Sequence, residues 1–118
     1  MYFLIKMLYN IIDNDIYGGI MIKHVTEENF EKEISKERIL VDFYATWCGP
    51  CKMLGMVMEK FDKKGIIDIV KVDVDGAPNL SSKYKIFSVP TLIIFENGAE
   101  VKRISGFMSE EDLEKWVG

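Results

Sequence analysis

The sequence predicts an α/β fold in which a mixed central β-sheet carries helices on both faces, and three observations predict it. Strand-like and helix-like segments alternate from residue 39 onward in the order βαβαββα. Strands that are joined through helices pair in parallel, whereas the Asn97-Gly98 dipeptide favours an antiparallel hairpin between the last two strands. A chain of 118 residues, 48% of them hydrophobic, can bury one compact core.

Two elements are expected ahead of the cysteines. A helix should begin at Thr26, which can cap its N-terminus, with Phe30 and Ile34 facing the core. Ile39–Ala45 is a continuous apolar and aromatic run of strand length, which is typical of a strand covered on both faces. Asp42 is the one charged residue in that run, so the strand is expected to place a carboxylate in the core.

From the cysteines onward the alternation continues. A helix should begin at or just after Cys48 and end before Gly65, because apolar residues recur between them at helical spacing. The later elements are a strand at residues 66–74, a helix at 78–84, strands at 91–95 and 101–105, and a closing helix. The closing helix should start after Ser109, which heads a capping-box-like sequence.

Residues 1–20 are interpreted as an N-terminal extension, and residues 21–118 as the folded domain. Lys6 and the acidic stretch from Asp13 interrupt the apolar start before it could cross a bilayer, and the charge order and cleavage site of a secretory signal are missing. Two interpretations stay open. Gly18-Gly19 ahead of Met21 could be a translated ribosome-binding sequence, with Met21 as the natural start. Alternatively, residues 1–20 contain a terminal helix with an apolar stripe at helical spacing.

The composition argues against several classes of function. With a formal charge of -4 and no cluster of lysine or arginine, the chain is expected to bind neither nucleic acid nor membrane. Its two cysteines are too few for a disulfide scaffold. A zinc site needs four ligands, and beside the cysteine pair the chain offers only His24 and carboxylates. We therefore expect no metal or cofactor, and we expect the cysteines to carry the chemistry.

The segment Cys48–Cys51, with the sequence "CGPC", suits thiol–disulfide exchange. A thiol attacks a disulfide only as the thiolate, and a helix N-terminus favours that form. Cys48 should lie at the N-terminus and attack, while Cys51, one turn further on, is near enough to displace the captured sulfur. Pro50 suits the first helical turn, where its missing N–H costs nothing, and Gly49 lets a partner chain approach closely.

Residues 22–117 resemble the thioredoxin family. The resemblance rests on "WCGPCK" after the strand "ILVDFYAT" and on "SVPT" before a later strand, in the family's order. It implies the thioredoxin fold and a protein disulfide reductase that cycles between a Cys48–Cys51 disulfide and a dithiol. A Gly-Pro pair between the cysteines is similar to the reducing members of the superfamily rather than the oxidising ones.

The resemblance also implies roles for single residues. Cys48 corresponds to the nucleophile, Cys51 to the resolving cysteine, and Asp42 to the buried acid that manages the proton of Cys51. Lys71 corresponds to a lysine near that acid, and Pro90 to a cis-proline opposite the disulfide. The residues that would contact the substrate are Trp47, Gly49, Pro50, Val89, Pro90 and Gly106. The backbone of Val89 would pair with an extended substrate strand.

Burial should raise the pKa of Asp42, because it disfavours the charged form, and Lys71 should oppose that shift without reversing it. A purely structural buried carboxylate is the alternative interpretation of Asp42. Three residues depart from the family pattern. Met56 replaces a proline that usually kinks the helix, and Phe87 and Phe107 replace smaller or charged residues near the substrate groove, which predicts a more apolar rim.

The sequence thus predicts a cytoplasmic, monomeric protein disulfide reductase that maintains redox homeostasis through electron transfer to its targets. Its partners would be disulfide-containing proteins and, as electron donor, a flavin thioredoxin reductase that uses NADPH. Two alternatives remain. One is a scaffold subunit with the same fold, whose partner recognises the reduced surface without turnover. The other is an exported oxidase or isomerase, which the poor match of residues 1–20 to a secretory signal and the Gly-Pro pair between the cysteines disfavour.

Overall fold

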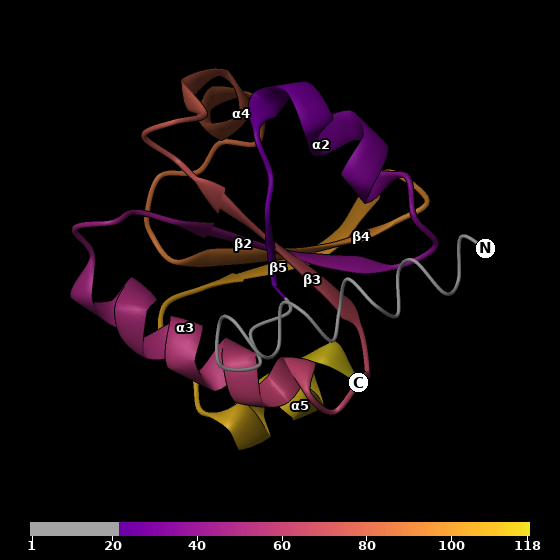
Figure 1. The fold of residues 1–118 in the computed structure, drawn as a ribbon, viewed down its shortest axis with the longest axis vertical. Coiled ribbons are helices and arrows are strands. Elements are labelled where there is room, and N and C mark those ends of the chain that lie inside the picture. Colours follow the sequence, from indigo (N-terminus) through magenta and orange to yellow (C-terminus); the bar gives the residue numbers. More distant parts are fainter. Residues whose placement is uncertain (1–21) are drawn as a thin grey trace, which may run out of the picture.

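A five-stranded sheet runs through the centre of residues 22–118, the part of the chain that the computed structural model describes (Figure 1). The strands are β1 (Lys23–His24), β2 (Ile39–Tyr44), β3 (Asp68–Asp73), β4 (Thr91–Glu96) and β5 (Ala99–Ser105). They pair in the order β1-β3-β2-β4-β5. β1 and β2 lie parallel to β3, and β4 is antiparallel to β2 and β5. The predicted mixed sheet is confirmed.

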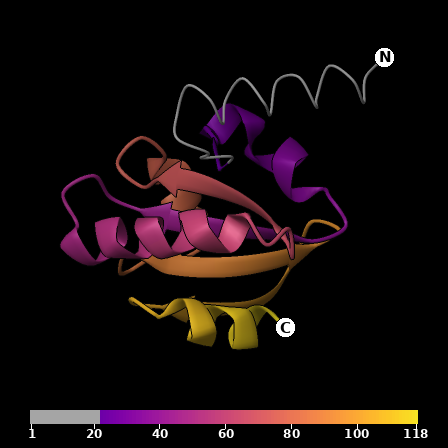
Figure 2. The ribbon, with the colours of Figure 1, turned by 60° about the horizontal axis from the view of Figure 1, so that its bottom comes forward.

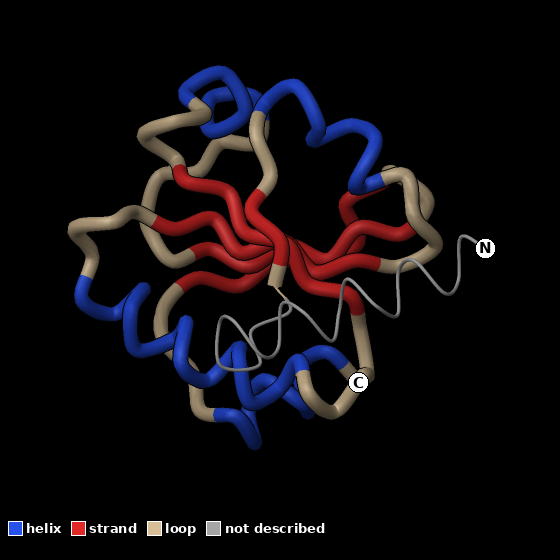
Figure 3. The backbone as a smooth tube through the Cα atoms, in the orientation of Figure 1, coloured by secondary structure: helices blue, strands red, loops and turns tan. Residues whose placement is uncertain are grey.

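Helices cover both faces of this sheet, as the sequence predicts (Figures 1 and 3). α2 (Glu27–Ile34) and α4 (Pro78–Lys83) lie on one face, and α3 (Gly49–Asp62) and α5 (Glu110–Val117) lie on the other (Figure 2). None of the helices within residues 22–118 has the length and apolar character of a membrane span. The interpretations of residues 1–20 and of a start at Met21 fall outside the described residues.

The central strand β2 is buried on both faces, which explains its nearly continuous apolar sequence. Val41 and Phe43 belong to the core cluster under α2 and α4, whereas Leu40 belongs to the cluster under α3 and α5. Successive side chains of a strand point to opposite faces. Asp42 and Tyr44 therefore share the face of Leu40 and point toward the layer of α3.

The local signals at turns and helix ends are confirmed with one exception. Asn97 and Gly98 have φ values of 52° and 86°, so both residues of the hairpin loop adopt the left-handed conformation of a type I′ turn. The Ser109 hydroxyl accepts a hydrogen bond from the N–H of Asp112 at 3.1 Å, as an N-cap should. Thr26 occupies the N-cap position of α2, but its side chain makes no capping hydrogen bond.

The sequence did not predict the edge strand β1. It consists of two exposed residues, too few to show an alternating pattern, and it exists through its pairing with β3. In that pairing Lys23 lies opposite Val70, and His24 lies opposite Lys71. Because β3 in turn places Lys71 opposite Asp42, one row of three neighbouring strands carries an imidazole, an ammonium group and a carboxylate.

Candidate active site

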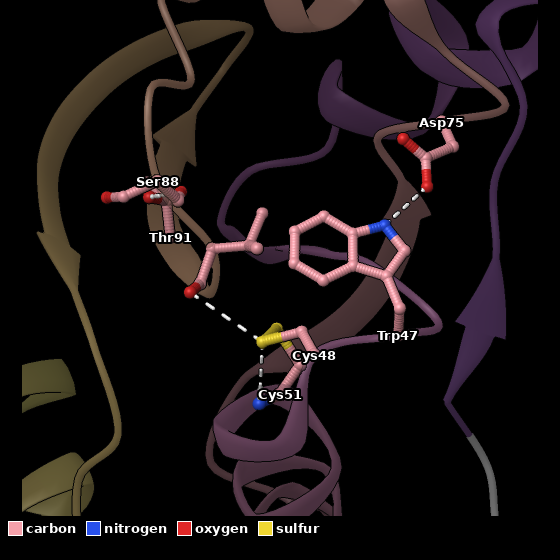
Figure 4. The surroundings of a disulfide bond; sticks show 7 residues. Trp47, Cys48, Cys51, Asp75, Ser88 and Thr91 are labelled. Atoms are coloured by element: carbon pink, nitrogen blue, oxygen red, sulfur yellow. Dashed lines mark hydrogen bonds between the residues drawn. A yellow bond between two sulfur atoms is a disulfide. The ribbon is translucent and has the colours of Figure 1, made fainter.

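Cys48 and Cys51 form a disulfide at the N-terminus of α3, which is the arrangement that the sequence predicts. Cys48 is the N-cap residue of the helix, and its Sγ accepts a hydrogen bond from the Cys51 N–H at 3.2 Å (Figure 4). The same N–H group and the partial positive charge of the helix end would stabilise a Cys48 thiolate once the disulfide is reduced.

A cavity of about 500 Å³ opens beside the disulfide, and Cys48, but not Cys51, lines it. Its walls come from the start of α3, the turn after β3 and the loop before β4. Most of its lining is apolar, and two aromatic side chains project into solvent at its rim. Trp47 is 70% exposed and Phe87 is 91% exposed, so Phe87 lies at the rim as expected from the sequence, whereas Phe107, the other residue expected there, does not line the cavity.

Trp47 is held in place by a residue that the sequence analysis missed. Its Nε1–H donates a hydrogen bond to Asp75 Oδ2 at 2.9 Å, as Figure 4 shows. Asp75 is positioned in turn by its own backbone N–H, which donates to Asp73 Oδ1 at 3.0 Å. Trp47 and Asp75 are 28 residues apart in the sequence, so no local sequence pattern predicts their contact.

The loop before β4 faces the disulfide from the opposite wall of the cavity. The Val89–Pro90 peptide bond is cis, as the resemblance implies, and the Val89 carbonyl oxygen lies 3.7 Å from Cys48 Sγ. The hydroxyl of Thr91 donates to the Ser88 carbonyl at 2.7 Å. This bond ties the two ends of the loop together and fixes the backbone that faces Cys48.

Gly106 supports the same loop from outside the cavity. Its N–H donates to the Pro90 carbonyl at 2.9 Å, and its φ of 98° is a conformation that favours glycine. Neither Gly106 nor Pro90 lines the cavity itself. The half-exposed ring of Phe107 follows directly in the chain. Of the six residues expected to contact substrate, the other four line the cavity: Trp47, Gly49, Pro50 and Val89.

Asp42 is fully buried, and neither of its carboxylate oxygens has a hydrogen-bond partner among residues 22–118. Burial raises the pKa of Asp42 from 3.8 to about 6, and the positive charge of Lys71 opposes that rise. The predicted direction is therefore confirmed. A carboxyl group of this kind can bind and release a proton near neutral pH.

Lys71 lies opposite Asp42 in the register of β2 and β3, but its ammonium group is directed elsewhere. Lys71 Nζ lies 4.3 Å from the centre of the Tyr44 ring. Asp42 and Lys71 do not line the cavity. Tyr44 is a second residue that the sequence analysis did not single out.

Comparisons with known proteins agree with this geometry. The thioredoxin family model matches residues 21–118. The thioredoxin of Staphylococcus haemolyticus is 46% identical over 94 residues, which cover 78% of this chain and 90% of the relative. The thioredoxin of Staphylococcus aureus is 45% identical over 94 residues with the same coverage of both chains.

Two solved structures are also similar. A mutant thioredoxin from Halobacterium salinarum NRC-1 has a TM-score of 0.75 and 34% identity, and the match covers 80% of this chain and 86% of that one. The second belongs to a study of the thiol-resolving mechanism in yeast mitochondrial 1-Cys peroxiredoxin via glutathione/thioredoxin systems. It has a TM-score of 0.74 and 30% identity, and covers 82% of this chain and 93% of that one.

Proposed function

The chain belongs to the thioredoxin family and is a thiol–disulfide reductase, and we propose that Cys48 is its nucleophile and Cys51 its resolving thiol. The observation that carries this assignment is the position of the two sulfurs. Cys48 caps α3 and lines the cavity, whereas Cys51 lies one turn further into the helix and does not line it.

In the first step, the Cys48 thiolate of the reduced protein attacks one sulfur of a disulfide in a target protein. A bond forms between Cys48 and that sulfur, the target disulfide breaks, and its other sulfur leaves as a thiolate that takes up a proton. In the second step, Cys51 loses its proton and attacks Cys48. The Cys48–Cys51 disulfide forms, and the second target sulfur leaves, so that two electrons have passed to the target.

Asp42 is proposed as the group that accepts the proton of Cys51. It points from β2 toward the layer of α3, the helix that carries Cys51, and its raised pKa suits proton transfer near neutral pH. The raised pKa has a cost in stability, which argues against the purely structural interpretation of this carboxylate.

Target segments are proposed to bind in extended form across the loop before β4. Among residues 22–118 neither the backbone N–H nor the carbonyl of Val89 pairs with another backbone group, which supports strand pairing there, and the carbonyl is also the atom that lies 3.7 Å from Cys48 Sγ. Regeneration of the dithiol needs an electron donor, for which we propose a flavin thioredoxin reductase that uses NADPH. A cytoplasmic, monomeric protein is part of the same proposal.

Trapping of mixed disulfides tests the two cysteine roles. Cys51→Ser should leave Cys48 able to capture a disulfide substrate such as insulin but unable to release it, so stable adducts should appear on non-reducing gels. Cys48→Ser is the matched control and should trap nothing. Equal trapping by both variants would reverse or remove the assignment. Wild type should also accelerate insulin reduction by dithiothreitol, which a scaffold subunit need not do.

A further inference from the structure

Tyr44 lies next to the buried acid, and the mechanism above gives it no part. It is two residues after Asp42 on β2, so its side chain lies on the same face of the sheet. Its ring contacts the Lys71 ammonium group, and its hydroxyl lies 3.2 Å from His24 Nδ1. Three strands therefore contribute to one group of polar side chains, of which Tyr44 also packs against the core cluster that contains the two cysteines.

Lys71 has two competing partners in this group. The carboxylate of Asp42, opposite in register, would attract the ammonium group strongly in a buried site. Neither Asp42 oxygen, however, has a hydrogen-bond partner within the described chain. The ammonium group instead lies 4.3 Å from the centre of the Tyr44 ring and against α3, where a Cβ built on Gly55 would be 3.5 Å from Nζ.

We propose that Tyr44 is a positioning residue that holds the Lys71 ammonium over its ring and away from the Asp42 carboxylate. An aromatic ring attracts a cation to its face, and this attraction competes with the carboxylate for the lysine. Gly55 of α3 borders the ammonium group on its other side, where a Cβ would lie at ordinary van der Waals distance from Nζ.

The Tyr44 ring is itself fixed from β1. The His24 ring meets it edge to face with 5.9 Å between the centroids, in addition to the contact at the hydroxyl. The charged and titratable neighbours are Asp42 on β2, Lys71 and Asp73 on β3, His24 on β1, and Cys51 of α3 in the reduced protein. Burial raises the pKa of Tyr44, and the charges of Asp73 and Asp42 add to the rise, so the hydroxyl stays protonated.

The consequence concerns the second step and rests on the function proposed above. A carboxylate without an ion-pair partner keeps its raised pKa and remains a good proton acceptor near neutral pH. If Lys71 paired with Asp42 directly, the charged carboxylate would be stabilised and would become a weaker base. Tyr44 thus sets the basicity of Asp42.

The test is a carboxyl 13C NMR titration of Asp42 in the oxidised protein, where the cysteines do not titrate. Tyr44→Leu removes the ring and should lower the midpoint of Asp42 by about one pH unit, because an opposite charge nearby lowers a carboxyl pKa by that order. Tyr44→Phe keeps the ring and loses only the hydroxyl, so it should keep the wild-type midpoint. An unchanged midpoint in Tyr44→Leu, or an equal drop in Tyr44→Phe, overturns the proposal.

Two further measurements test whether Lys71, and not another consequence of the substitution, lowers the Asp42 midpoint in Tyr44→Leu. With Lys71→Met as background, Tyr44→Leu should no longer lower the Asp42 midpoint, and a persistent drop would mean that water entry, not the lysine, is responsible. In the unaltered protein the ε-methylene protons of Lys71 should be shifted upfield by the ring current of Tyr44. Ordinary chemical shifts there overturn the proposal even if Tyr44→Leu does not fold.

Release rates of a mixed disulfide, measured against pH, distinguish failure of this inference from failure of the proposed function. In Tyr44→Leu the acid limb of the release profile should move to lower pH together with the Asp42 midpoint. If the Asp42 titration midpoint moves but the pH profile of mixed-disulfide release does not, the positioning role of Tyr44 is supported and Asp42 is removed from proton transfer. A midpoint that does not move, in a variant that still reduces insulin, overturns the positioning role alone.

Discussion

Replacement of Asp42 by asparagine should make the protein more stable at neutral pH. Asparagine has the shape of aspartate and similar hydrogen-bonding reach, but it cannot ionise. Asp42 is fully buried without a hydrogen-bond partner among the described residues, so its charged form is held in an unfavourable site. The variant Asp42→Asn removes that charge and leaves the surrounding packing nearly unchanged.

The size of the effect follows from the pKa of Asp42, which rises from 3.8 in an ordinary environment to about 6 in the folded protein. Below the lower value both the folded and unfolded states are protonated, and the carboxyl group adds no penalty. Between the two values the unfolded state loses its proton first, so the folded state becomes progressively less favoured. Above about 6 the penalty levels off at about 3 kcal/mol, an order-of-magnitude figure from 1.36 kcal/mol per pH unit.

Urea unfolding of the oxidised wild type and of Asp42→Asn, at a series of pH values, measures this penalty. The variant does not titrate at this position, so the difference in free energy of unfolding should increase from acid to neutral pH by roughly 3 kcal/mol. Any constant cost of burying the amide cancels in that change. Glu37→Gln alters an exposed carboxylate and is the matched control.

A difference that stays flat between acid and neutral pH would refute the raised pKa. A variant that is less stable than wild type at neutral pH would favour the structural interpretation of Asp42. The same variant should also release mixed disulfides more slowly, because the group that takes the proton of Cys51 is gone. Unchanged release would remove Asp42 from the mechanism.

Two further predictions concern the rim of the cavity and the closing helix. Phe87→Ser should lower kcat/KM about fivefold for peptides whose disulfide is flanked by large apolar residues, and less for peptides with polar flanks, because only the former lose apolar contact with the exposed ring. Equal losses for both peptides would contradict a role in specificity. Ser109→Ala should cost about 1 kcal/mol in urea unfolding through loss of the N-cap, and Ser109→Asp should retain most of that stability. Similar losses in both variants would show that the cap is not responsible.

The central strand and the helix after it could be predicted because local rules determine them. An apolar run of strand length needs cover on both faces, and the alternation of its side chains then fixes which face carries Asp42. The cysteine spacing and the Gly-Pro pair placed the start of α3 in the same way. In these segments the hydrophobic pattern of the sequence matches the strand and the helix that the structure contains.

Other parts could not be predicted, because they depend on contacts between distant segments. β1 has no pattern of its own and is defined by its pairing with β3. Asp75 contacts Trp47 from the turn after β3, and its sequence neighbours give no sign of it. The alternation of side chains along the strands places Tyr44 and Lys71 on the face of Asp42. It does not predict that the Lys71 ammonium group lies over the Tyr44 ring instead of pairing with Asp42. That choice depends on side-chain geometry in three dimensions.

Helix geometry explains why the two cysteines differ in environment although they are chemically identical. Residues three apart lie about one turn apart along a helix and on nearly the same side of it. At a helix N-terminus this spacing leaves the first thiol at the cap, where the Cys51 N–H faces it, and places the second one turn into the helix. Cys48 therefore meets the substrate cavity, and Cys51 is positioned on the helix that covers the face of Asp42. The same burial that destabilises the Asp42 carboxylate gives it a pKa of about 6, so the group that weakens the fold is also the one suited to take a thiol proton at neutral pH.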